Sequence, residues 1–132
     1  MCKYKIAIAS FLTSVLLFTV AGCNKAVTIV ENPGNSITDE MSFAKDIIPI
    51  FKTNCALSGC HVPGAQLPDL SAADAYISLT GGNYITANDP DNSELIFWLT
   101  GKKSPTMPLG GSLDVMSNAK IYAWIKQGAK NN

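Results

Sequence analysis

The sequence contains no arginine, so all ten of its positive charges come from lysine, and they balance ten acidic residues. A neutral chain without a basic run lacks the electrostatic signature of a nucleic-acid-binding protein, and we expect no such partner. The 132 residues also include one histidine only, His61. Blue-copper sites need two histidines, and catalytic zinc sites usually need more nitrogen or carboxylate ligands than this chain can gather around His61. Neither type of metal centre is expected.

The first 22 residues are predicted to be a signal peptide rather than part of the fold. Two early lysines precede a short apolar run over residues 6–20, in the order typical of secretory signals. The run ends in the letters VAGC at residues 20–23, which resemble the lipobox of bacterial lipoproteins. That resemblance implies cleavage before Cys23 and acylation of this cysteine, which would anchor the chain to a membrane of the bacterial cell envelope, on its periplasmic or cell-surface side.

The mature chain is expected to consist of a tether and one small domain. Residues 23–40 are rich in Asn, Ser, Thr, Pro and Gly and lack helical periodicity, so they are predicted to be a flexible tether. Residues 41–132 are predicted to form an all-α domain of about four short helices and long loops, because no convincing alternating strand pattern is present. The apolar spacing places these helices at residues 42–53, 71–79, 93–100 and 117–127.

Two local signals refine these helices. Pro49 lacks a backbone donor, so the first helix should kink or restart there. Ser71 is the expected N-cap of the second helix. Short helices in a domain of this size bury only a modest core, and such domains often depend on a staple or a cofactor.

The letters CALSGCH at residues 55–61 place the only histidine directly after two cysteines. Two thiols can form thioethers with the two vinyl groups of a haem, and the following histidine can reach the iron; C-x-x-C-H is the familiar form of this motif. Here four residues separate Cys55 from Cys60, and Ser58 and Gly59 give that longer spacer the freedom to bulge. The motif predicts one covalent haem c, held by Cys55, Cys60 and His61.

Two other interpretations of the cysteines stay open. Exported cysteine pairs usually form disulfides, so Cys55 and Cys60 could be a structural staple in a lipoprotein that binds no haem. The same two thiols could also serve a thiol redox or metal-transfer protein. Haem colour in a visible spectrum distinguishes these interpretations from a cytochrome.

Met107 is the expected second ligand of the iron. It lies within the letters SPTMPLGG at residues 104–111, where prolines on both sides favour an extended loop that projects a side chain. Met116 is the reserve ligand, and otherwise it is expected to fill space in the core, as methionine commonly does.

Residues 41–132 resemble a class I cytochrome c domain of the kind found in bacterial lipoproteins. The matching segments are DIIPIF at residues 46–51, Cys60-His61, the Met107-Pro108 loop and WIKQGA at residues 124–129. The resemblance implies that the first and last helices cross beside the haem, with Phe51 and Trp124 as packing candidates. Because the chain has no arginine, the resemblance implies that the haem propionates accept hydrogen bonds from Tyr84, Trp98, lysine or backbone donors.

A haem with His61 and Met107 on its two faces has no open position for a substrate, and methionine ligation raises its reduction potential. We therefore expect an electron carrier rather than an enzyme. Its partners would be other redox proteins, which it would meet at the haem edge through small and transient contacts.

Overall fold

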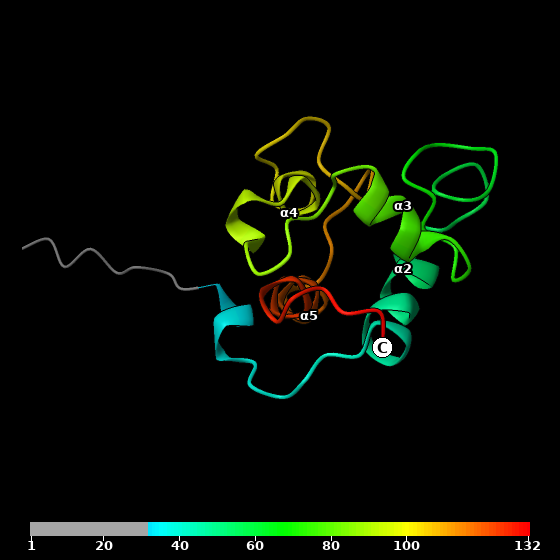
Figure 1. Ribbon diagram of the computed structural model, residues 1–132. Coiled ribbons are helices and arrows are strands. Elements are labelled where there is room, and N and C mark those ends of the chain that lie inside the picture. Colours follow the sequence, from blue (N-terminus) through cyan, green and yellow to red (C-terminus); the bar gives the residue numbers. More distant parts are fainter. Residues whose placement is uncertain (1–31) are drawn as a thin grey trace, which may run out of the picture. The chain divides into compact units, whose positions relative to one another are not determined.

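The computed structural model describes residues 32–132, so the expected signal peptide and Cys23 lie outside the described residues. The described part consists of helices and long loops and contains no strand, which confirms the prediction of an all-α domain (Figure 1). None of its helices is long and apolar enough to span a bilayer.

The helix predicted over residues 42–53 forms in two parts. The first part, η2 (Phe43–Ile47), is a π-helical turn, and α2 (Ile48–Asn54) follows it directly. Pro49 lies in the first turn of α2, where its missing N–H and fixed backbone angle are tolerated. The predicted restart at Pro49 is confirmed.

Three more α-helices complete the domain, together with two short 3₁₀ turns. In chain order these elements are η1 (Pro33–Ser36), α3 (Ala75–Gly81), η3 (Pro90–Asn92), α4 (Glu94–Leu99) and α5 (Val115–Lys126). The prediction of Ser71 as N-cap is wrong, because α3 begins only after a turn over residues 71–74 and has Asp74 at its N-cap. The hydroxyl of Ser71 is buried without a hydrogen-bond partner.

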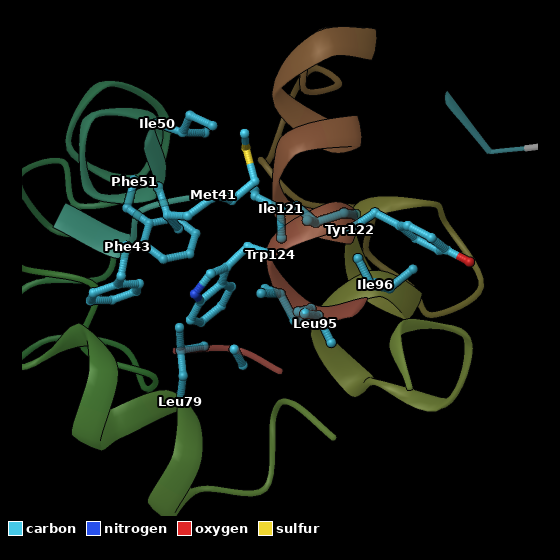
Figure 2. Close-up of a cluster of buried hydrophobic side chains, with 14 of the residues drawn as sticks. Met41, Phe43, Ile50, Phe51, Leu79, Leu95, Ile96, Ile121, Tyr122 and Trp124 are labelled. Carbon is cyan, nitrogen blue, oxygen red and sulfur yellow. The ribbon is translucent and has the colours of Figure 1, made fainter. Parts of the chain in front are cut away.

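The centre of the core lies where α5 meets η2. Trp124 is fully buried, and its ring centroid lies 5.0 Å from that of Phe43. The Phe43 ring also meets the edge of Phe51, at 6.5 Å between centroids. Figure 2 shows these three aromatic side chains pointing toward one another. The indole N–H of Trp124 donates to the carbonyl oxygen of Lys130 at 2.9 Å, so the buried ring has no unsatisfied donor.

Met116 does not belong to this core, and its interpretation as a core filler is wrong. Its side chain is 59% exposed, whereas Met41 is 8% exposed and packs inside. The physical reason is that α5 begins two residues earlier than predicted, at Val115. Asp114 is its N-cap, and Met116 lies in the first turn, before the buried face of α5 begins at Ala119.

Residues 33–40, which we call the strap, were expected to be part of a flexible tether, but they pack against α5. Gly34 is buried so closely that a Cβ there would lie 2.7 Å from the carbonyl oxygen of Ala119. At the other end of the strap, the Gln127 side chain donates to the carbonyl oxygen of Asp39 at 2.9 Å. The folded part of the chain therefore extends upstream of the predicted boundary.

Candidate functional site

A pocket of about 590 Å³ opens between the loop that follows α2, helix α4 and the loop that follows α4. This volume suits a cofactor-sized organic molecule. Its walls are mainly apolar and aromatic, and they include Leu67, Leu70, Tyr84, Leu95, Trp98, Leu99 and Pro108. The pocket brings together all four residues proposed from the sequence to hold a haem, which are Cys55, Cys60, His61 and Met107.

Backbone hydrogen bonds close the segment between the two cysteines into a compact turn. The Cys60 N–H donates to the carbonyl oxygen of Leu57 at 2.9 Å, and the His61 N–H donates to that of Cys55 at 3.2 Å. Gly59 has a φ of 79°, a left-handed conformation that glycine adopts without strain. The four-residue spacer therefore bulges at Gly59, as its composition predicted, while its two ends stay linked.

The imidazole of His61 is held by a backbone carbonyl on the far side of the loop. Its Nδ1 atom lies 2.9 Å from the carbonyl oxygen of Pro68. A carbonyl can only accept, so Nδ1 must carry the hydrogen in this bond. In the neutral ring, Nε2 then keeps its lone pair. A partner of this kind commonly orients a metal-binding histidine and increases its basicity.

Cys55 and Cys60 are both free thiols. Burial, and to a lesser extent the neighbouring Cys60, raises the pKa of the Cys55 thiol to about 11. Because the thiolate is the reactive form in thiol exchange and metal transfer, a partly buried thiol with a raised pKa, such as Cys55, is less suited to either role at neutral pH. Within residues 32–132, no three His, Cys, Asp or Glu side chains gather into a metal-binding group.

Met107 faces the pocket from the loop that follows α4. It is partly buried and packs against the hydrophobic core. Its backbone N–H donates to the carbonyl oxygen of Trp98 at 3.0 Å, so the loop returns to the helix that it left. Met116 does not line the pocket, and the structure therefore does not place this reserve ligand near His61.

The polar edge of the pocket is organised around Glu94, the one carboxylate among its lining residues. Glu94 Oε1 accepts from the Trp98 indole at 3.1 Å and from the Lys103 ammonium at 2.6 Å. The hydrogen bond from Lys103, followed by that from Trp98, holds the pKa of Glu94 below its usual range. Trp98, an expected donor to a propionate, thus already has an acceptor, and Tyr84 is the other aromatic donor in the lining.

Sequence reasoning did not identify the carbonyl of Pro68 or the carboxylate of Glu94 as parts of the site. Neither carries a sequence signal, because a backbone carbonyl is present at every residue and Glu94 resembles any acidic residue near the start of a helix. No protein-family model, curated protein or solved structure matches this chain.

Proposed function

We propose that the pocket holds one haem c, bound through thioethers to Cys55 and Cys60, with His61 and Met107 as the iron ligands. The observation that carries the proposal is the His61–Pro68 hydrogen bond, which leaves Nε2 as a lone-pair donor in a pocket that also contains both thiols and a methionine. The apolar walls suit a flat, largely apolar macrocycle. A nitrogen ligand and a thioether ligand are a combination that cytochromes c use.

The bound group would supply a one-electron couple, and the residues of the chain would set its surroundings. Cys55 and Cys60 would hold the group covalently: each thiol would add its sulfur to one carbon of a vinyl group and its proton to the other, so attachment would need no oxidant. His61 presents Nε2 while Pro68 fixes the orientation of its ring. Met107 would supply the second iron ligand and so leave no open position for a substrate, which is the basis for proposing an electron carrier and no enzymatic reaction.

We also propose that the protein works at a membrane surface of the bacterial cell envelope. The support comes from the sequence of residues 1–23, with Cys23 as the acylated residue. Two or more acyl chains are needed for a stable anchor. The partners would then be redox proteins that reach the pocket mouth through brief contacts.

The attachment is tested by making the protein in a host that matures c-type cytochromes and extracting it with acidic organic solvent. The haem should stay with the denatured polypeptide. Cys55→Ala and Cys60→Ala should each weaken retention, and the double variant should lose all of it. Ser58→Ala, in the exposed spacer, is the matched control and should retain haem fully.

Loss of all haem from the unaltered polypeptide on extraction would reject the thioether proposal. A protein that never binds haem and shows a Cys55–Cys60 disulfide by mass spectrometry would instead be a structural lipoprotein.

The anchor is tested by a separate substitution, Cys23→Ser, which should leave an uncleaved precursor. An unmodified Cys23 in the mature protein would remove the anchor from the proposal.

A further inference from the structure

The loop that carries Met107 is attached to α4 through Lys103. The Lys103 N–H donates to the carbonyl oxygen of Phe97 at 3.1 Å, and its ammonium donates to Glu94 at 2.6 Å. The same ammonium lies 5.4 Å from the centroid of the Trp98 ring, within the range of a cation–π contact. Lys103 is therefore held by its backbone and its side chain against one face of α4.

Met107 is attached to the same turn of α4. Its N–H donates to the carbonyl oxygen of Trp98, while the Trp98 indole donates to Glu94. Glu94 thus accepts hydrogen bonds from two residues that fix the loop. Lys103 belongs to the loop itself, and the carbonyl oxygen of Trp98 accepts from the Met107 N–H. One carboxylate ties the loop and the helix together next to the pocket.

The loop can run back over α4 because the chain adopts a left-handed conformation at Gly101, where the loop starts. Gly101, directly after the C-cap of α4, has a φ of 75°, which L side chains rarely adopt. A Cβ at Gly101 would also lie 3.1 Å from Thr106 Oγ1. The chain therefore turns sharply at Gly101 and runs back over α4, where Lys103 and Met107 make their contacts.

We propose that Glu94 is a positioning residue for Met107, because it draws Lys103 onto α4 and so keeps the loop closed over the pocket. This inference rests on the proposed function for its effect on the iron, since a closed loop would keep the methionine sulfur available as a ligand. An external ligand binds only when the loop opens, so its apparent affinity follows the open fraction. The side chains of Lys103 and Glu94 are 40% and 38% exposed, and an ion pair of this exposure has a modest effect.

The first experiment is an imidazole titration of the ferric, haem-loaded protein. Glu94→Gln keeps an acceptor for Trp98 but removes the charge, and we expect imidazole to bind about two- to fivefold more tightly. Lys103→Gln should have the same effect, and the double variant should equal either single variant. Lys102→Gln is the matched control, because Lys102 lies over Phe97 and forms no ion pair within the described residues.

The second experiment measures the loop directly, in the same haem-loaded protein. Hydrogen exchange at the Met107 amide should be about two- to fivefold faster in Glu94→Gln and Lys103→Gln than in the unaltered chain, and unchanged in Lys102→Gln. Equal exchange in all four proteins would overturn the positioning role, as would additive effects of Glu94→Gln and Lys103→Gln in the double variant. A wild type that lacks the methionine–iron band but shows the exchange pattern would reject Met107 as ligand while retaining Glu94 as the residue that positions the loop.

Discussion

Nδ1 of His61 and the carbonyl oxygen of Pro68 are joined by a hydrogen bond of 2.9 Å that spans seven positions of the chain. The bond restrains rotation of the imidazole, because a flipped ring would place a carbon opposite the carbonyl. A second backbone bond, from the Leu70 N–H to the carbonyl oxygen of His61, holds the same loop closed at 3.0 Å. The backbone of this loop therefore sets the orientation of the ring.

The orientation of His61 predicts its tautomer. With ring nitrogens labelled by ¹⁵N, the neutral imidazole of the haem-free protein should carry its hydrogen on Nδ1 rather than on Nε2. His61 is the only histidine, so the NMR spectrum contains one pair of ring nitrogen signals to assign. A spectrum dominated by the Nε2–H form would contradict the hydrogen bond to Pro68. Chemical denaturation is the control, since the Nδ1 preference should disappear with the fold.

The placement of Met107 and Met116 predicts opposite results for their substitution. In the haem-loaded protein, Met107→Ala should abolish the near-infrared charge-transfer band of thioether-bound ferric iron and let added imidazole bind. Its reduction potential should also fall, since methionine ligation raises it. Met116→Leu should keep the band and change the free energy of unfolding by no more than about 0.5 kcal/mol, because Met116 is exposed.

The reverse pattern, with the band lost only in Met116→Leu, would show that Met107 is not the ligand. If the unaltered protein already bound imidazole freely, the iron would be five-coordinate. The proposal of an electron carrier would then be rejected, and a sensing or catalytic role would replace it.

The approximate helices, the bulge at Gly59 and the loop position of Met107 could be predicted because their signals are local. Pro49 interrupts a helix through its own covalent structure, and Gly59 adopts a left-handed turn because it lacks a side chain. Met107 could be selected because its flanking prolines restrict the loop that contains it. In each case the deciding interaction lies within a few residues of the chain.

The parts that were missed depend on contacts between distant segments. Gly34 belongs to a polar, Gly- and Pro-containing segment whose composition indicates a linker, yet it is buried because α5 leaves no room for a side chain there. Met116 has an apolar side chain of the kind found in cores, but it lies before the buried face of α5. Glu94 becomes part of the pocket only because Lys103 and Trp98 donate to it.

The packing of the strap makes Gly34 sensitive to the smallest substitution. In Gly34→Ala, the new Cβ would lie 2.7 Å from the Ala119 carbonyl oxygen and 2.8 Å from Tyr122 Cδ1. The backbone of α5 cannot move away from this Cβ, so the strap itself would have to shift. The free energy of unfolding should therefore fall by about 1–3 kcal/mol. Gly111→Ala is the matched control, because nothing lies within 4 Å of a Cβ at that position. Equal denaturation midpoints for the two variants would show that the strap is not packed as described.

The N-cap of α5 predicts how the stability of the domain responds to acid. Asp114 Oδ1 accepts from the Ser117 N–H at 2.9 Å, and the Ser117 side chain and backbone hydrogen bonds lower the pKa of Asp114 from its ordinary value of 3.8. A negative charge at this end of a helix also interacts favourably with the helix dipole. The folded state therefore binds this proton less readily than the unfolded state does. The stabilisation from Asp114 is complete above its unfolded pKa and is lost as the pH falls through the lower, folded pKa.

Replacing the carboxylate by an amide separates its charge from its capping hydrogen bond. Asp114→Asn should have nearly the stability of the unaltered protein when acid has removed the charge, and somewhat lower stability at neutral pH, because asparagine caps about as well as aspartate but carries no charge. Urea denaturation between about pH 5 and pH 2 should therefore show a shallower loss of stability in Asp114→Asn. Asp114→Ala should be less stable than Asp114→Asn throughout, since alanine cannot accept from Ser117. Parallel curves for the unaltered protein and Asp114→Asn would mean that the charge of Asp114 contributes nothing to the stability of the fold. The acid sensitivity of the domain would then come from other carboxylates with lowered pKa values, such as Glu40 and Glu94.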